Sequence, residues 1–92
     1  FAGHETTANL MTWSVYLLRC GDGTLYCGIA LDVEARLAQH QAGKGAKYTR
    51  GRAPLELVYE EVCGNRGEAL RRERAVKRLS RAEKLALAGL PS

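Results

Sequence analysis

Two stretches rich in β-branched, aromatic and leucine residues lie near the start of the chain, on either side of a short turn. They cover residues 14–20 and 24–30, and a Gly-Asp-Gly turn at 21–23 separates them. Two such stretches around a three-residue, glycine-containing turn predict a β-hairpin. If Cys20 faces Thr24 across this hairpin, all even-numbered residues point to one face and all odd-numbered residues to the other.

The two faces of the predicted hairpin differ in composition. The even-numbered face places Tyr16 opposite Gly28 and also carries Leu18 and Tyr26, so two tyrosines share a face with a glycine that leaves space there. The odd-numbered face is expected to be the stronger core face. It carries Val15, Leu17, Leu25, Cys27 and Ile29.

A helix is predicted directly after the hairpin, over residues 33–41. Asp32 is a suitable N-cap, and Gly43 ends the helix. Val33 and Leu37 lie on its apolar stripe. Arg36 and His40 are four residues apart, so they project from the same side of the helix.

The rest of the chain adds one strand and two helices. Alternation predicts a strand over 55–62, with Leu55, Leu57 and Tyr59 on one face. A helix follows over 68–79, and a capping box at Ser80 starts a last helix that runs to about residue 88. The buried stripe of the 68–79 helix is expected to carry Ala69, Leu70, Val76 and Leu79. The order ββαβαα predicts an α+β domain with a small, mostly antiparallel three-stranded sheet flanked by helices.

The net charge of +4 is unevenly distributed along the chain. Residues 44–52 and 66–92 are net positive, whereas residues 1–43 and 53–65 are net negative. This distribution favours a polyanionic partner, nucleic acid above all. No apolar stretch approaches the ~20 residues that a membrane-spanning helix needs, so no membrane partner is expected.

The three cysteines do not form a recognisable framework. Cys20, Cys27 and Cys63 show neither a CxxC pair nor a metal-ligand spacing. Cys20 and Cys27 would point to opposite faces of the hairpin, which argues against a disulfide between them. We therefore expect free thiols and a cytoplasmic protein.

Glu73 is the most unusual residue of the later helices, because it lies in the middle of an apolar stripe. A carboxylate there must be paired, bound to a metal or displaced toward the edge. A pair with Lys77, four residues on, is the plainer alternative, and position alone weights the two equally.

Several side chains with chemical potential are expected to converge beside the basic loop. Taken singly, the tyrosines are more often packing residues, and Arg36 and His40 more often surface residues. Together with a carboxylate they form the set that phosphodiester cleavage needs: a base for water, a cation for the transition-state charge and a metal ligand. The set comprises Tyr16, Tyr26, Arg36, His40 and Glu73.

Over residues 13–87 the chain resembles the GIY-YIG nucleases, and as a whole it looks like the small stand-alone bacterial proteins of this family. Val15-Tyr16 and Tyr26-Cys27-Gly28 match the two motifs that name the family. The resemblance continues in order through residues 32–40, 43–51, 68–73 and 77–84.

The resemblance implies a GIY-YIG fold and a hydrolase that cleaves DNA phosphodiesters with a single Mg²⁺ or Mn²⁺ ion. Tyr16 and Tyr26 match the motif tyrosines, one of which takes part in removing a proton from the attacking water. Arg36 matches an arginine that stabilises the transition state, and His40 matches a position near the nucleophile. Glu73 matches the glutamate that holds the metal.

The chain also departs from the family pattern. Ser14 stands for the first motif glycine and Cys27 for the isoleucine of the second motif, and both changes look tolerable. Ile29 occupies a position where some members carry an active-site lysine, and no asparagine follows residue 65. Weak, narrowly structure-selective or absent activity is therefore a real alternative.

The basic loop is the expected contact surface for nucleic acid. Phosphate contacts of this kind position a substrate without specifying a sequence. Tyr48 could stack on a base, or it could pack on its own domain. The expected phosphate-binding residues are Lys44, Lys47, Arg50 and Arg52.

The first nine residues resemble a different family. Phe1-Ala-Gly-His-Glu-Thr-Thr-Ala-Asn is similar to the oxygen-activating helix of haem-thiolate monooxygenases. The rest of that fold is missing, and neither Cys20 nor Cys63 lies in a glycine-flanked thiolate loop, so no haem is expected. We expect residues 1–12 to be a poorly ordered leader or fusion remnant, 13–88 the domain and 89–92 a tail.

The sequence thus predicts a metal-dependent DNA endonuclease, structure-selective and linked to repair or recombination. Its DNA substrate could be branched, nicked or single-stranded, and the oligomeric state is left open. The main alternative is a nucleic-acid-binding module with the same fold and little or no cleavage. A third is an adaptor that uses its basic helices on an acidic protein.

Overall fold

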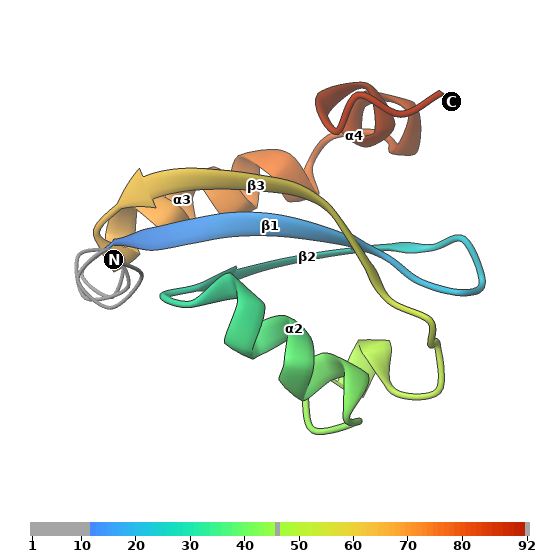
Figure 1. Ribbon diagram of the computed structural model, residues 1–92. Helices are drawn as coiled ribbons and strands as arrows, with labels where there is room; N and C mark the ends of the chain where they lie inside the picture. Colours follow the sequence, from blue (N-terminus) through green and yellow to red (C-terminus); the bar gives the residue numbers. More distant parts are fainter. Residues whose placement is uncertain (1–11, 46, 92) are drawn as a thin grey trace.

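The fold is a three-stranded antiparallel sheet with helices on both faces, and its middle strand contributes to both buried clusters (Figure 1). The computed structural model describes residues 12–45 and 47–91. The strands lie in the order β2-β1-β3. Their bounds are Trp13–Arg19 for β1, Leu25–Ala30 for β2 and Glu56–Gly64 for β3. The helical elements are α2 (Val33–Gln41), the short 3₁₀ helix η1 (Lys47–Thr49), α3 (Arg66–Lys77) and α4 (Arg81–Leu87). The predicted order ββαβαα and the α+β class are confirmed.

The hairpin of β1 and β2 has the register that the sequence predicts. Tyr16 pairs with Gly28 and Ser14 with Ala30. At the turn, the Cys20 amide donates to the Thr24 carbonyl at 2.8 Å. The even-numbered side chains of this hairpin therefore face α2, and the odd-numbered ones face α3.

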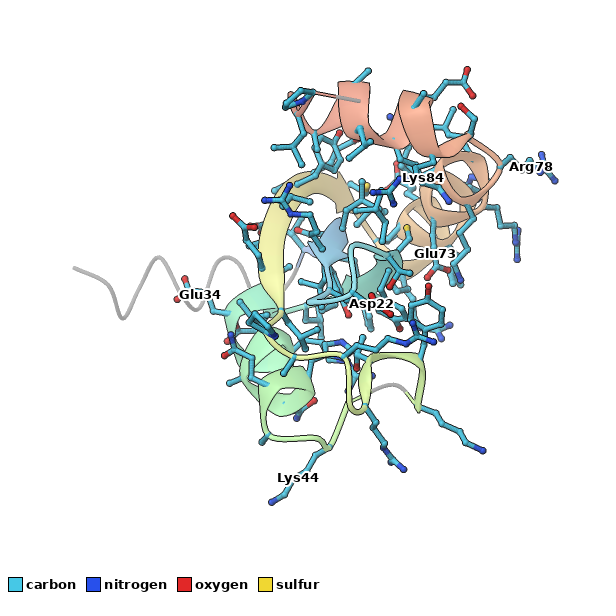
Figure 2. The ribbon with its side chains drawn as sticks, turned by 90° about the vertical axis from the view of Figure 1, so that its right-hand side faces the viewer. Asp22, Glu34, Lys44, Glu73, Arg78 and Lys84 are labelled. Atoms are coloured by element: carbon cyan, nitrogen blue, oxygen red, sulfur yellow. The ribbon has the colours of Figure 1, made fainter. Side chains whose placement is uncertain are left out.

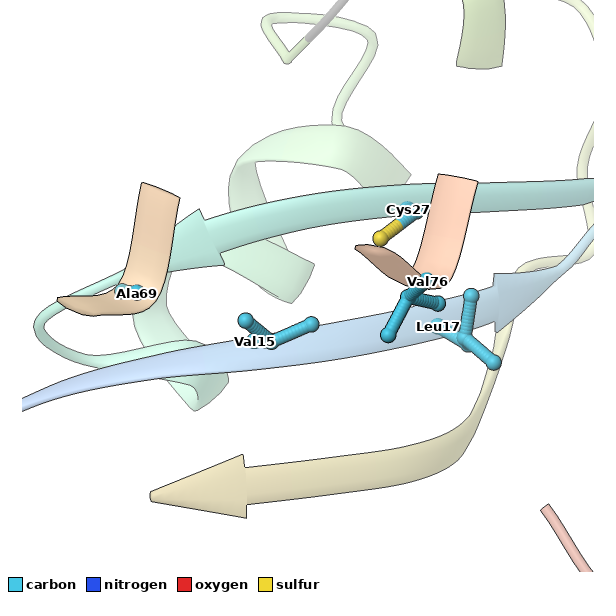
Figure 3. Packing of buried hydrophobic residues seen from close by; sticks show 5 residues of the cluster. All are labelled: Val15, Leu17, Cys27, Ala69 and Val76. Atoms are coloured by element: carbon cyan, nitrogen blue, oxygen red, sulfur yellow. The ribbon is translucent and has the colours of Figure 1, made fainter. Parts of the chain in front are cut away.

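Both faces of the sheet are buried, and the odd-numbered face carries the larger of the two buried clusters, as predicted. On the odd-numbered face, Val15, Leu17 and Cys27 pack against Ala69 and Val76 of α3 (Figure 3). The other face is also buried, because α2 covers it. Its cluster consists of Tyr16, Leu18, Ala30 and Val33, with Tyr26, Leu37 and Leu57 packed around them.

The third strand begins one residue later and ends two residues later than predicted, and it does not keep one face throughout. Leu17 pairs with Tyr59, but Leu18 pairs with Leu57, so the register shifts at Val58. A bulge of this kind places an extra residue on one strand and reverses the alternation beyond it. Leu57 therefore joins the cluster under α2 while Tyr59 joins the one under α3, contrary to the prediction that they share a face.

The helices begin at capping residues that the chain supplies. Asp32 caps α2 as predicted and accepts a hydrogen bond from the Ala35 amide at 3.1 Å. Helix α3 begins two residues before the predicted start, because Asn65 and Glu68 form a reciprocal capping box. Ser80 and Glu83 form the predicted box at α4.

Some sequence expectations concern single features or residues at the ends of the chain. All three cysteines are free, as expected. Among the described residues, no helix has the length and apolar character needed to cross a membrane. The expected leader, except for Thr12, and the monooxygenase-like motif lie outside the described residues.

Candidate active site

A buried hydrogen-bonded row of three side chains forms the centre of the candidate site. The Tyr16 hydroxyl and His40 Nε2 are 2.9 Å apart, and His40 Nδ1 is 2.8 Å from Thr49 Oγ1. Tyr16 is 1% exposed, and His40 and Thr49 are each 2% exposed. These residues come from β1, α2 and η1 respectively, so the row joins three elements that are distant in sequence.

The surroundings of this row favour neutral groups. Burial, followed by the nearby Tyr26, raises the pKa of Tyr16 to about 12, although Arg36 acts in the opposite direction. Burial and the positive charge of Arg36 lower the pKa of His40 below its usual 6.5. At neutral pH the row therefore contains a protonated phenol and an uncharged imidazole.

Two glycines make this arrangement possible by leaving space for the rings. A Cβ at Gly28 would lie 2.6 Å from the Tyr16 hydroxyl and 3.0 Å from the Tyr26 ring. A Cβ at Gly45 would lie 2.7 Å from His40 Cγ, so the basic loop packs its backbone directly on the imidazole. The predicted role of Gly28 as the residue that leaves space beside the tyrosines agrees with this geometry.

Tyr26 forms the outer layer of the site. Its ring centroid is 5.2 Å from that of His40 and 6.2 Å from that of Tyr16. On its other side, the Tyr48 ring lies 5.8 Å away. Tyr26 is half-buried, whereas Tyr16 is enclosed, so Tyr26 is the phenol nearer to solvent.

Arg36 lies on the same side of α2 as His40, as its spacing predicts. Its guanidinium donates to Gln39 Oε1 at 2.8 Å. It is also close enough to Tyr16 to favour the ionised phenol. The structure therefore brings Tyr16, Tyr26, Arg36 and His40 together.

The basic loop (residues 43–53) is fastened to the hairpin turn beside this site. The Arg52 guanidinium lies 4.4 Å from the Tyr48 ring centroid and forms an ion pair with Asp22. The Gly21 amide donates to the Arg52 carbonyl at 2.6 Å. Lys44, Lys47 and Arg50 are exposed, and Figure 2 shows Lys44 pointing away from the rest of the molecule.

Glu73 is placed differently from the other candidates. It lies on α3, which covers the opposite face of the sheet from Tyr16 and His40, and Lys77 Nζ is 3.5 Å from its carboxylate. Only 16% of its side chain is exposed. After burial, its negative charge is the main cause that raises the pKa of Cys27 to about 11. Cys27 adjoins Tyr26 on the edge strand β2, so the carboxylate lies beside that edge.

Thr49 and Gly45 are site residues that the sequence did not reveal. Both lie in the basic loop, whose charge suggested a surface role for the whole segment. The sequence offers one sign of Thr49, a small hydroxyl residue between Tyr48 and Arg50. That sign does not show that Thr49 contacts His40. The contact with His40 depends on the fold of the loop, which the sequence pattern does not encode.

The sequence matches the GIY-YIG catalytic domain over residues 12–86, which is most of the chain. The chain belongs to the GIY-YIG family. A UPF0213 protein of Nitratidesulfovibrio vulgaris is 55% identical over 74 residues, covering 80% of this chain and 67% of that protein. A UPF0213 protein of Halobacterium salinarum is 53% identical and covers 79% and 95% of the two chains.

Two solved structures resemble this GIY-YIG chain. The solution structure of a UPF0213 protein from Bacillus halodurans has 47% identity and a TM-score of 0.55, covering 86% of this chain and 84% of its own. The solution structure of a protein from E. faecalis has 36% identity and a TM-score of 0.58, covering 85% of this chain and 84% of its own. The predicted resemblance and fold are thereby confirmed, and membership places the chain in a nuclease superfamily.

The family implies a divalent metal, and the donor set here is compatible with a sparse site. Among the residues that the structure describes, no cluster of three or more His, Cys, Asp or Glu side chains could hold a metal. Mg²⁺, however, often keeps several waters and takes only one or two carboxylates. Glu73, with a partly exposed side chain and a loose partner in Lys77, fits the role of a single protein ligand.

Proposed function

We propose that this protein is a divalent-metal-dependent DNA endonuclease, structure-selective and active in DNA repair or recombination in the cytoplasm. The observation that carries the proposal is the buried hydrogen bond between Tyr16 and His40, with Arg36 and Tyr26 beside it. This group lies next to a basic loop, and positive surface charge supports binding to a phosphate backbone. Its DNA substrate could be branched, nicked or single-stranded.

Tyr16 and His40 are assigned to proton removal. With a pKa of about 12, Tyr16 is a phenol at neutral pH and is a poor base by itself. Its oxygen can accept the proton of the attacking water as its own proton passes to His40 Nε2. In the tautomer that this transfer requires, His40 Nδ1 carries hydrogen and donates it to Thr49 Oγ1.

The groups nearer to solvent are assigned to substrate and water. Tyr26 holds the attacking water beside the Tyr16–His40 pair. Arg36 binds a non-bridging phosphate oxygen, because a guanidinium stabilises the negative charge that develops there. Lys44, Lys47, Arg50 and Arg52 hold the flanking phosphates, and Tyr48 contacts a base or the sugar.

Glu73 is assigned to the single Mg²⁺ or Mn²⁺ ion. When bound, the ion would offset charge on the phosphate and on the leaving oxygen. Glu73 must then leave its 3.5 Å contact with Lys77 or share its carboxylate between the two. The Lys77 side chain is 55% exposed, so its ammonium can move into solvent when the carboxylate binds the ion.

The test is cleavage of labelled single-stranded, duplex, nicked, flap and four-way-junction DNA with Mg²⁺ or Mn²⁺. Glu73→Gln keeps the shape of the side chain and removes its charge, so it should abolish cutting while leaving DNA affinity nearly unchanged. Tyr16→Phe keeps the ring and should lower the rate by about 100-fold or more, the range of general acid–base catalysis. Lys77→Ala is the matched control and should still cut.

Two outcomes would contradict these assignments. Equal loss in Lys77→Ala and Glu73→Gln would mean that Glu73 acts through the ion pair and not through a metal. Tight, salt-sensitive binding by the wild-type protein without any cleavage would favour the binding module. That second candidate is supported by Ile29, which stands where some members carry lysine, and by the placement of Glu73 on α3.

A further inference from the structure

A recess lies next to Arg36, at the opposite end of the sheet from the hairpin turn. It has a volume of about 380 Å³ and lies where β1 starts, where β2 ends and where α2 and α3 begin. Sites for small molecules commonly measure about 300–1,000 Å³. Its apolar lining includes Trp13, Ile29 and Leu31, and its polar lining includes Arg36, Gln39 and Arg66.

The lining of this recess has the chemistry of a nucleotide site. The Arg66 guanidinium lies 5.6 Å from the Trp13 ring centroid, so an indole and a planar cation stand together. Leu31, 37% exposed, adds an apolar surface that a ligand could cover. Nucleic-acid bases stack on aromatic rings and on guanidinium planes alike.

The polar groups of the recess suit a base edge and a phosphate. Gln39 provides an amide, and Asp32, which also lines the recess, provides a carboxylate that already caps α2. Such groups match donors and acceptors on bases. Arg36 and Arg66 supply two positive charges against the single negative charge of Asp32, which favours an anionic ligand.

Arg36 belongs both to this recess and to the candidate active site. It contacts Gln39 at 2.8 Å and lies close enough to Tyr16 to affect the ionisation of that phenol. At the other end of the site, Arg52 lies over Tyr48 at 4.4 Å. An arginine–aromatic pair therefore stands on each side of the Tyr16–His40 pair.

We propose that this recess binds one unpaired nucleotide adjoining the phosphate held by Arg36, with its base against Trp13 and Arg66. The inference rests on the proposed nuclease function and specifies its substrate: a strand whose base next to the cleaved bond is not paired. A base inside a duplex has both faces covered by its stacked neighbours, so it cannot lie against Trp13 and Arg66. A base must therefore be single-stranded or turned out of the duplex to enter, as in other enzymes that bind bases in pockets.

Trp13 makes the test direct, because it is the single tryptophan of the chain. Its fluorescence is titrated, with EDTA present, against a pentanucleotide with a phosphorothioate backbone and against a set carrying one abasic site at each position in turn. Anisotropy of the same labelled oligonucleotides measures total binding. The intact strand should quench the fluorescence saturably, and one abasic position should abolish most of the quenching and weaken binding by about fivefold or more, as expected for one lost stacking contact.

Two arginines of α3 provide a matched pair of variants. Arg66→Ala should weaken binding of the intact pentanucleotide several-fold and remove the dependence on the abasic position. Arg74→Ala, on the same helix but not lining the recess, should do neither. A fully paired blunt duplex should leave Trp13 fluorescence unchanged.

The possible failures are distinguishable. Binding by anisotropy with no position-dependent change at Trp13, or with equal effects of the two arginine variants, overturns the recess as a nucleotide site and leaves the proposed nuclease in place. Absence of all oligonucleotide binding overturns both proposals. Equal quenching by the blunt duplex overturns the requirement for an unpaired base.

Discussion

Gly28 determines how close the phenol of Tyr16 can approach the edge strand. The space beside that glycine holds the Tyr16 hydroxyl, which in turn reaches His40 at 2.9 Å. A row of neutral, hydrogen-bonded groups can be buried without the penalty of an isolated charge. At the residue scale, the candidate site therefore depends on the space that Gly28 leaves as much as on the side chains of Tyr16 and His40.

We expect Gly28→Ala to destabilise the protein by about 1–3 kcal/mol, the range for added volume at a filled position. The new methyl group would lie 2.6 Å from the Tyr16 hydroxyl, so the phenol must move away from its position. Urea denaturation measures the loss of stability. Gly23→Ala, at a turn glycine with open space but a positive φ, separates this steric effect from backbone strain. Equal stability of wild type and Gly28→Ala would show that the Tyr16 ring can move to make room for a methyl group at no cost.

The pH dependence of the proposed cleavage should reveal the environment of His40. Its pKa is lowered from 6.5 by burial and by Arg36, so the imidazole stays neutral below that pH. The rate should therefore hold down to pH 6.5 and fall only at lower pH, as His40 becomes protonated. Single-turnover cleavage across this range gives the profile, and a fall that begins above pH 6.5 would contradict the assignment.

The lowered pKa of His40 should also make the folded protein less stable as the pH falls. Because the folded protein holds His40 with a lower pKa than the unfolded chain, the unfolded chain binds more protons between the two values. The free energy of unfolding should thus decrease as pH falls below 6.5 toward the folded pKa. His40→Gln should show a smaller decrease over this window in urea titrations.

At the scale of elements, α3 carries Glu73, and contacts with all three strands determine which side of this helix faces the sheet. Ala69 and Val76 are fully buried against β1 and β2. Arg72 donates to Glu61 of β3 at 3.0 Å, and Tyr59 donates to the same carboxylate. These contacts fix the side of α3 that faces β2, and with it the position of Glu73.

We expect Asn65→Ala to destabilise the fold by about 1 kcal/mol through loss of the cap at the start of α3. Thermal or urea unfolding measures the change. Asn65→Asp keeps an acceptor and should retain most of the stability, which distinguishes capping from a general effect at this site. No change in Asn65→Ala would mean that side-chain contacts alone hold the first turn.

The sequence predicted most elements because their signals are local. Alternation, the Asp32 cap and the Ser80 box depend on neighbours in the chain, and the structure confirms the hairpin register and α2 to the residue. The face of Tyr59 was predicted wrongly, because one extra residue at Val58 reverses the pattern without a sequence signal of its own. Thr49 was missed because its contact with His40 forms only when the basic loop folds back over α2.

At the scale of the whole molecule, positive charge gathers in the basic loop on the side of α2 and along α3 and α4 on the other side of the sheet. Lys44 and Arg78 mark these two regions in Figure 2. The proposed DNA path follows the first region, which adjoins the Tyr16–His40 pair, and meets α3 only at Glu73 and Arg66.

Lys44→Ala and Lys47→Ala should each weaken DNA binding and reduce the slope of log K against log salt concentration by about 1, since each removes one phosphate contact. Affinity of a fixed DNA measured over a salt series tests this. Arg78→Ala is the control on the opposite face and should leave the slope unchanged. An equal reduction in Arg78→Ala would place the DNA over α3 and α4 instead.

The position of Tyr16 on the middle strand has a consequence for how such proteins can diversify. β1 is hydrogen-bonded along both of its edges and covered on both of its faces, so it separates only when the whole domain unfolds. The basic loop is held to the hairpin turn by a few contacts around Arg52 and can change without loss of that sheet. Mutations in the loop can therefore change the proposed substrate contacts while the Tyr16–His40 pair stays in place. Gly45 and Thr49 are the two loop positions that cannot vary in this way, because both lie against His40.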